Sequence, residues 1–405
     1  MISVEKALKK ILNQTKPLPP IHRPLLKSLG HLLATDIFSP EPLPSFTNSA
    51  MDGYAVCLEN RNRFLKPLKV IEEIPAGKFP KEKIKQGTAA RIMTGAPLPQ
   101  GADAVVPLEQ TEILEDGSVR ILSQVQMGQF IRQRGEEIQL NERIFSKGHL
   151  LKPEDLGLLA SLGLNEIAVI PKPSISLVTT GSEVIAASQQ PKLGQIRNSN
   201  LISMAAALTH LGYPIHKATH VKDSPRALKS IFKKCTSDVI ISIGGVSVGK
   251  YDFIKKVLLE RGKIIFWKVA MKPGKPFLFG RIGRSYFFGL PGNPVSALVT
   301  FEILVKPALL ALSGHKNRGL SPRGQSPIFP AKEKAVLTCS IKHNPDLQEY
   351  VRARVHKTKG GLKITPLAQQ GSHMLRSLTE ANAWIVLPQK IKNFSAGSTV
   401  HFLPQ

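Results

Sequence analysis

The clearest structural signal in the chain is Asp238-Val-Ile-Ile-Ser-Ile-Gly-Gly-Val-Ser-Val-Gly-Lys-Tyr-Asp252. Its first six residues are mostly apolar and β-branched, which is typical of a short strand buried on both faces. A glycine pair ends that run, and a helical pattern follows up to Arg261. A buried strand, a Gly-rich loop and a helix in succession predict one unit of an α/β domain.

The same pattern continues on both sides of this stretch. Further strands are predicted at residues 174–180, 264–269 and 285–290, and helices at 200–211, at 224–234 and from Val295. Strands that alternate with helices predict βαβ units and a mostly parallel sheet. The fold class is therefore a multidomain α/β plus β protein with a central α/β domain.

The remaining segments differ in how prolines and glycines interrupt them. Residues 1–37 read as helices broken by prolines, and Pro40, Pro42 and Pro44 enforce an extended segment. Short strands with Gly and Pro turns fill 51–145 and 330–405, whereas a helix is predicted from Leu151. We predict an elongated linker domain (1–44 and 142–170), a β-rich second domain (45–141), the α/β domain (171–316) and a small C-terminal β-barrel (317–405), for which a sandwich is the alternative.

Composition limits the function classes. The 405 residues include 55 Lys+Arg and 29 Asp+Glu, a formal net charge of +26, which favours anionic partners of any kind. Nucleic-acid binding is disfavoured because aromatic residues are only 6% and no basic block stands out, although charge alone leaves it open. Three separated cysteines, an amphipathic start without a signal-peptide core, and the broken apolar stretch 295–312 predict a cytoplasmic protein without a membrane span.

Predicted strands end in unusual loops, and ligands bind at the carboxyl ends of strands in open α/β sheets. Thr180-Gly181-Ser182-Glu183 presents a carboxylate, but alone it is more typical of a helix N-cap. The loop 244–252 has three glycines, whose N–H groups can approach an anion, and Asp252 could hold a metal ion. Its spacing imitates a P-loop, yet Tyr251 replaces the magnesium-binding Ser/Thr. A plain glycine turn with Asp252 as helix cap is the alternative.

One further loop is basic, and another starts a helix. Residues 268–276 carry three lysines in a rigid Pro-Gly frame, which suits an oxyanion, although solvated surface lysines would look alike. In 290–296, Asn293 and Pro294 start a helix whose free N–H groups form an anion cradle, and an ordinary helix start is an equal alternative. Asp223 adds a carboxylate or caps the next helix. Together the loops predict one cleft for a phosphorylated, anionic small molecule with Mg²⁺.

Longer motifs carry a family resemblance across nearly the whole chain. They are SAMDGYAV (49–56), RIMTGAP (91–97), RQRGEEI (132–138), TGSEV (180–184), GGVSVGKYD (244–252), MKPGKP (271–276), GLPGNPVSA (289–297), VRAR (351–354) and QGSHML (370–375). In order and spacing the chain resembles the molybdopterin molybdenumtransferases, a family that includes MoeA and the E domain of gephyrin. One departure is Glu137, where the family usually has Asp.

The resemblance implies the substrates, molybdate and adenylylated molybdopterin, and Mg²⁺-dependent release of AMP. It also implies a homodimer, whose cleft joins the α/β domain of one subunit to the second domain of the other, and hand-over from molybdopterin adenylyltransferase. The catalytic positions it implies are Asp52, Glu183, Asp223, Asp252, Lys268 and Lys272, with Glu183 and Asp252 as metal ligands. The substrate-binding positions are Thr94, Arg132, Gly244, Gly245, Ser247, Gly249, Lys275, Pro291, Gly292, Pro294, Ser296, Arg352 and Ser372.

Two rival functions keep part of this pattern. A molybdopterin adenylyltransferase shares the α/β domain, but it normally lacks the additional β modules. A non-catalytic dimeric scaffold keeps the whole fold, but it does not need the acidic and basic loop residues.

Overall fold

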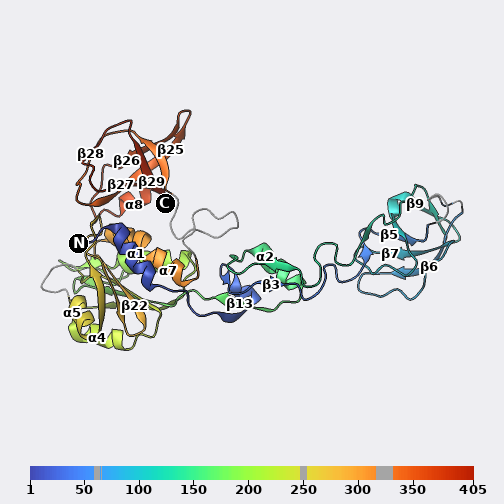
Figure 1. Ribbon diagram of the computed structural model, residues 1–405, viewed down its shortest axis with the longest axis horizontal. Coiled ribbons are helices and arrows are strands. Elements are labelled where there is room, and N and C mark those ends of the chain that lie inside the picture. The colour runs from blue at the N-terminus through green and yellow to red at the C-terminus, as the bar shows by residue number, and fades with distance from the viewer. Residues whose placement is uncertain (59–63, 65, 247–252, 316–331) are drawn as a thin grey trace. The chain divides into compact units, whose positions relative to one another are not determined.

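The computed structural model describes residues 1–405 except 59–63, 65, 247–252 and 316–331 (Figure 1). Contacts divide the chain into two compact units. Unit one comprises Met1–Ala34, Gly148–Lys152 and Glu166–Gln405, and unit two comprises Thr35–Lys147 and Pro153–Asn165.

Unit one is built on a six-stranded mixed sheet. Its order is β17 (Ile215–Val221), β14 (Ile175–Thr180), β18 (Val239–Ile243), β22 (Ser285–Leu290), β21 (Leu278–Ile282) and β19 (Gly262–Trp267). The first four strands are parallel, whereas β21 runs antiparallel to both of its neighbours. Strands β14, β18 and β22 are buried at every residue, as the apolar runs predicted. Strand β21 was not predicted, and it lies between the predicted strands at 264–269 and 285–290.

Helices cover both faces of this sheet. Alternate strand residues point to opposite faces, so Leu177 and Phe288 join one core while Val178 and Phe287 join the other. The first core also contains α1 (Val4–Gln14), α3 (Ser199–His210), α6 (Pro294–Thr300) and α7 (Lys306–Leu312), whereas α4 (Pro225–Lys233) and α5 (Phe253–Arg261) cover the second. A π-helical turn, η4 (Phe301–Val305), joins α6 to α7.

The C-terminal region forms a closed five-stranded barrel. The ring is β25 (Gln348–Thr358), β26 (Gly361–Pro366), β23 (Glu333–Leu337), β29 (Thr399–Pro404) and β27 (Ala383–Leu387), which pairs again with β25. Closure leaves no free sheet edge within this ring and encloses a core that includes Val351, Ile385 and Phe402. A sixth strand, β20 (Met271–Lys272), reaches β25 from the α/β part of the unit. The short α8 (Arg376–Glu380) and the pair β24 (Ile341–Lys342) and β28 (Asn393–Phe394) complete the region.

The N-terminal segment corrects the prediction of broken helices over residues 1–37. Only α1 is an α-helix there, and η1 (Leu25–Ser28) is a single 3₁₀ turn. The rest is extended: β1 (Ile21–Pro24) and β2 (Leu32–Leu33) pair with β13 (Glu166–Ile170). Prolines at 17, 19, 20 and 24 explain the difference, because each lacks an N–H donor and biases the preceding residue toward extended backbone.

Unit two is β-rich. Its main sheet has the order β6 (Lys69–Ile74), β7 (Thr88–Ile92), β5 (Gly53–Val56), β8 (Ala104–Pro107), with apolar clusters around Tyr54 and Ala55. Two-stranded pairs are β4 (Asn48–Ser49) with β11 (Ile131–Arg132), β3 (Ile37–Phe38) with β12 (Arg143–Phe145), and β9 (Thr111–Ile113) with β10 (Val119–Ile121). The helix predicted from Leu151 is α2 (Pro153–Ser161).

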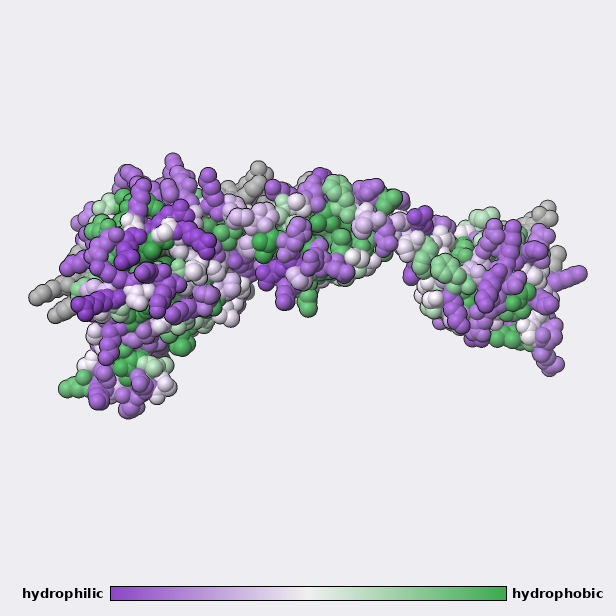
Figure 2. Space-filling model, turned by 90° about the horizontal axis from the view of Figure 1, so that it is seen from below, coloured by the Kyte–Doolittle hydropathy of each residue, from purple (hydrophilic) through white to green (hydrophobic). Residues whose placement is uncertain are grey.

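One helical stretch among the described residues, Pro294–Leu312, is long and apolar enough to cross a bilayer, but most of it is buried inside the molecule. Its composition is therefore that of a core helix. On the face shown in Figure 2, hydrophilic residues predominate and apolar residues are scattered among them.

Candidate functional site

The loops predicted to converge meet at a cavity of about 640 Å³ at the carboxyl edge of the sheet. Each of the four loops contributes to its wall: Glu183 from the first, Gly244 from the second, Pro276 from the third and Gly292 from the fourth. Of the predicted site residues, Glu183, Asp223, Gly244, Gly245, Pro291, Gly292 and Pro294 line this cavity.

The first loop is a tight turn and does not start a helix. Residues 182–183 form a turn that leads into the short strand β15 (Val184–Ile185), so the helix-cap interpretation of Ser182 and Glu183 is wrong. Gly181 has φ +144°, and a Cβ there would lie 3.0 Å from both carboxylate oxygens of Glu183. The absence of a side chain at Gly181 therefore lets the Glu183 carboxylate fold back over the turn.

Asp223 holds the first loop to the end of β17. Its Oδ2 accepts a hydrogen bond from Ser182 N at 3.1 Å, and Asp223 N donates to Ser182 Oγ at 3.3 Å. Asp223 does not cap α4, because the N-cap is Ser224, whose side chain accepts from Ala227 N. The predicted carboxylate therefore fixes the geometry of two neighbouring strand ends.

The glycine pair lies against Thr180. Gly244 and Gly245 have φ values of +94° and +64°, and a Cβ at Gly244 would lie 2.9 Å from the Thr180 carbonyl oxygen. Only glycine fits this approach. Thr180 Oγ1 is buried and has no hydrogen-bond partner among the described residues, so the cavity wall offers an unsatisfied hydroxyl. Ser247, Gly249 and Asp252, three predicted site residues, lie outside the described part of the chain, as does Tyr251.

The fourth loop joins the sheet edge to the barrel. Asn293 occupies the N-cap position of α6, as predicted, but its side chain makes no capping hydrogen bond. Instead, Asn293 Nδ2 donates to Ser372 Oγ at 2.8 Å. Val295 N donates to the Ser372 carbonyl oxygen at 3.1 Å. Ser372 thus connects a barrel loop to the start of α6, while Ser296 is buried within that helix.

Two lysines of the basic loop, Lys268 and Lys272, contact groups outside the cavity. Lys268 and Lys272 are not among the residues that line the cavity. Lys268 adopts φ +65° and places its ammonium 4.2 Å from the centre of the Trp267 ring, which Lys255 also approaches at 4.0 Å. Lys272 Nζ lies 2.8 Å from Glu349 Oε1. Lys275 precedes Pro276, which does line the cavity.

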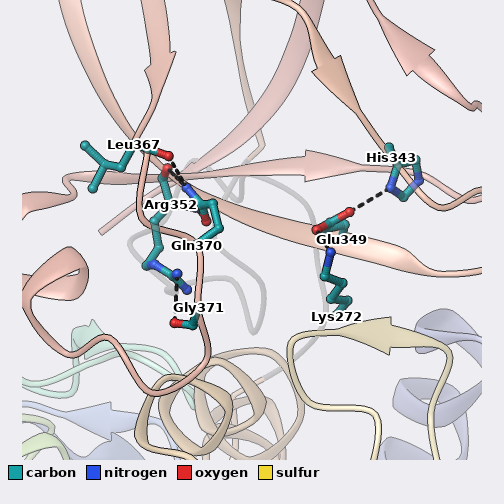
Figure 3. A network of polar contacts seen from close by, with 7 residues as sticks. All are labelled: Lys272, His343, Glu349, Arg352, Leu367, Gln370 and Gly371. Atoms are coloured by element: carbon teal, nitrogen blue, oxygen red, sulfur yellow. Dashed lines mark hydrogen bonds and ion pairs between the residues drawn. The ribbon is translucent and has the colours of Figure 1, made fainter.

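Arg352 is a fully buried cation on β25. Its Nη2 donates to the carbonyl oxygens of Gln369 and Gly371 at 3.0 and 3.1 Å, and Gln370 bonds its backbone (Figure 3). Nε and Nη1 have no partner among the described residues. Burial lowers the pKa of Arg352 from its usual value. A buried guanidinium with open donors is a strong attractor for an anion.

Three predicted residues belong to unit two. Asp52 Oδ1 accepts hydrogen bonds from Thr94 N at 2.6 Å and Thr94 Oγ1 at 2.7 Å. The backbone bond and then the hydroxyl bond hold the pKa of Asp52 below its usual range. Arg132 lies on β11 with an exposed side chain, and Glu137 is also exposed.

Sequence reasoning missed several polar residues of unit one. Arg197, Asn198, Asn200 and His373 line the cavity, and Asn200 Nδ2 donates to the Gly292 carbonyl oxygen at 2.7 Å. The run Asn198-Ser199-Asn200 at the start of α3 was an available signal, because polar residues gather at helix starts that face ligands.

No group of three or more His, Cys, Asp or Glu side chains that could enclose a metal ion occurs within the described ranges. Glu183 and Asp223 share the cavity. Asp223 Oδ2 already accepts from Ser182 N, whereas the Glu183 carboxylate suits Mg²⁺, which takes one or two protein carboxylates and completes its shell with water and phosphate oxygens.

A larger cavity of about 860 Å³ lies between α1, α7 and the barrel. Apolar residues such as Val4, Leu8 and Leu403 form much of its wall, and none of the predicted site residues lines it. Its chemistry gives no reason to move the candidate site from the sheet edge.

Family models match most of the chain. Residues 2–163 match the MoeA N-terminal region (domains I and II), and residues 334–405 match the MoeA C-terminal region (domain IV). Between them, residues 176–311 match a probable molybdopterin binding domain.

Whole-chain relatives agree with these matches. The molybdopterin molybdenumtransferase of Haemophilus influenzae is 35% identical over 100% of this chain and 98% of its own length. That of Staphylococcus aureus (strain COL) is 32% identical over 99% and 95%. The crystal structure of the MoeA molybdopterin biosynthesis protein of Pyrococcus horikoshii has a TM-score of 0.79 and 29% identity, and covers 100% of this chain and 99% of that one.

Proposed function

The chain belongs to the molybdopterin molybdenumtransferase family, an enzyme family of molybdenum cofactor biosynthesis, and from this premise we propose that it inserts molybdate into adenylylated molybdopterin with release of AMP. The observation that carries the proposal is the cavity in which loops from four strand ends bring Glu183, Asp223 and a glycine pair together.

The proposed roles follow from the chemistry of each group. Backbone N–H groups at Gly245 and Gly292 hold the phosphate groups, with Pro291 and Pro294 fixing the loop of Gly292. Gly244, whose N–H donates to the Leu290 carbonyl oxygen at 3.0 Å, forms the turn that presents Gly245. Lys272, Lys275 and Arg352, with Ser372, attract the molybdate dianion through charge and hydrogen bonds. Ser247 and Gly249 belong to the loop that contains Gly244, and Lys268 belongs to the loop that contains Lys272. Ser296 supports the start of α6.

The carboxylates take the metal and proton roles. We assign Glu183 and Asp252 as Mg²⁺ ligands, with Asp223 fixing the Glu183 turn through Ser182. When bound, Mg²⁺ would neutralise negative charge on the oxygens of the phosphoanhydride, whose P–O bond is broken in the reaction. Asp52, Thr94 and Arg132 are proposed to contact the substrate from the second domain, with Asp52 held ionised by Thr94.

The proposal extends to partners and location. The protein works in the cytoplasm as a homodimer and accepts adenylylated molybdopterin from the molybdopterin adenylyltransferase that makes it.

The test is incubation of the purified chain with adenylylated molybdopterin and Mg²⁺, with and without molybdate, followed by measurement of AMP. Molybdate-dependent AMP release is the expected result, and Lys272→Ala and Asp252→Asn are expected to abolish it while circular dichroism stays unchanged. Absence of AMP release from the folded wild-type dimer would favour a scaffold. Formation of the adenylylated substrate from ATP would favour an adenylyltransferase.

A further inference from the structure

A chain of polar contacts connects Lys272 to the closed barrel. Lys272 Nζ lies 2.8 Å from Glu349 Oε1, and Glu349 Oε2 lies 3.0 Å from His343 Nδ1 (Figure 3). His343 Nε2 lies 3.1 Å from the Pro388 carbonyl oxygen. Neither Glu349 nor His343 belongs to the motifs from which the site was predicted.

Backbone pairing explains why these groups meet. Strand β20 is parallel to β25, with Met271 opposite Gln348 and Lys272 opposite Glu349. Gln348 N also donates to the Ala270 carbonyl oxygen at 2.9 Å. The basic loop therefore adds a short strand to the barrel, and this register brings the Lys272 side chain to Glu349.

Burial shows which member of the network is fixed. The side chain of His343 is 0% exposed and that of Glu349 is 11% exposed, whereas that of Lys272 is 58% exposed. A buried carboxylate is costly unless it is paired and hydrogen-bonded, and here both oxygens have partners. The ammonium has three N–H donors, so one bond to Glu349 leaves two for a ligand on the exposed side.

Both ring nitrogens of His343 face hydrogen-bond acceptors. Pro388 offers a carbonyl oxygen and Glu349 a carboxylate, and an ionised carboxylate and a carbonyl can only accept. Both ring contacts are hydrogen bonds only when His343 carries two protons. The Glu349 carboxylate thus lies between the Lys272 ammonium and the His343 ring.

We propose that Glu349, held by His343, is a positioning residue that fixes the Lys272 ammonium for molybdate binding. This inference rests on the proposed function for the identity of the anion. It assigns Glu349 no contact with the substrate, and places its effect entirely on the orientation of Lys272.

The direction in which molybdate affinity changes when Glu349 is removed distinguishes a positioning role from a simple effect of its charge. A carboxylate near an anion site repels the anion, so its removal alone would tighten binding. If Glu349 instead orients Lys272, removing it frees a long side chain and weakens binding, because ordering that chain again costs conformational entropy. The two explanations predict opposite changes.

The experiment is calorimetric titration of the full-length protein with inorganic molybdate alone, at fixed ionic strength. We expect Glu349→Ala to weaken binding by about tenfold, comparable to Lys272→Ala and equivalent to about 1.4 kcal/mol. Glu349→Gln is expected to weaken it less, because the amide oxygen still accepts from Lys272. His343→Gln is also expected to weaken molybdate binding, because the Glu349 carboxylate loses the His343 ring that holds it.

Glu380→Ala is the matched control, because it removes another carboxylate of this C-terminal region, one paired with Arg376 at 2.7 Å. It is expected to leave molybdate affinity unchanged. Unchanged or tighter binding in both Glu349 variants would overturn the proposal, and so would wild-type protein that does not bind molybdate. If molybdate binds and Glu349→Ala weakens it, but no AMP is released from adenylylated molybdopterin, the proposed function fails while the positioning role stands.

Discussion

Three charged residues that were predicted for the site are held by neighbouring groups. Asp52 accepts two bonds from Thr94, Asp223 exchanges bonds with Ser182, and Lys272 is paired with Glu349. Such preorganisation lowers the cost of arranging charged groups around a substrate. The motifs indicated which charged residues matter but not what holds them, because these partners are set by tertiary packing.

The Asp52 carboxyl provides a titration test at this scale. Its pKa is lowered first by the backbone bond from Thr94 and then by the hydroxyl bond. Thr94→Val removes only the second bond, so the pKa should rise part of the way toward its ordinary value of about 3.9. Carbon-13 NMR of the Asp52 carboxyl group measures this change, and Thr94→Ser, which keeps a hydroxyl, is the control.

The direction of the pH effect follows from the lowered pKa. The bonds to Thr94 favour the ionised form, so their contribution is present above the unfolded pKa and is lost as pH falls through the lowered folded pKa. An Asp52 midpoint that does not move in Thr94→Val would show that the hydroxyl bond is absent in solution.

At the scale of helices and strands, continuous apolar runs were the reliable guide. The buried runs 174–180, 238–243 and 285–290 became strands β14, β18 and β22, because their apolar residues need cover on both faces. Strand β21 was missed because Leu278–Ile282 is short, contains Gly280 and Arg281, and obtains its pairing from a hairpin rather than from a crossover. The positions of the four loops were predictable, but not the direction of Lys268 and Lys272.

The turn at Gly244 offers a stability test at this scale. Gly244→Ala would place a Cβ 2.8 Å from Thr180 Oγ1 and 2.9 Å from its carbonyl oxygen at positive φ. We expect a loss of about 3 kcal/mol in stability from backbone strain and the clash.

Gly194→Ala is the matched control for this turn, since Gly194 also has positive φ but no atom within 4 Å of the added Cβ. It should cost only about 1 kcal/mol. Calorimetric melting compares the two, and equal shifts of the melting temperature would contradict the close approach to Thr180.

The start of α4 separates a structural residue from a functional one. Ser224 caps the helix, whereas Asp223 bonds the Ser182 turn. Ser224→Ala should lower stability by about 1 kcal/mol and leave AMP release near wild type. Asp223→Ala should reduce AMP release with a smaller change in melting temperature. Reversed effects of these two variants would restore Asp223 as the helix cap.

At the scale of the whole molecule, the chain belongs to the molybdopterin molybdenumtransferase family. Its division into four domains stays a prediction. Contacts separate two compact units, and the closed barrel is one part of unit one. The formal charge of +26 is more than an anion site needs, so most of it belongs to the general surface.

Assembly gives a prediction for the intact chain. With a protomer mass of 44.3 kDa, the proposed homodimer should sediment at about twice this mass at micromolar concentration. Analytical ultracentrifugation measures the mass directly. A monomer across the concentration range in which AMP release is seen would show that dimerisation is not needed for turnover.

The most direct test of the central claim is the rate of molybdate-dependent AMP release by Glu183→Gln, compared with wild type at saturating Mg²⁺. Glu183 lies in the wall of the sheet-edge cavity, and the amide keeps its size while removing its charge. We expect the rate to fall by roughly 100-fold or more. A rate within twofold of wild type, in protein with an unchanged melting temperature, would show that the chemistry takes place elsewhere.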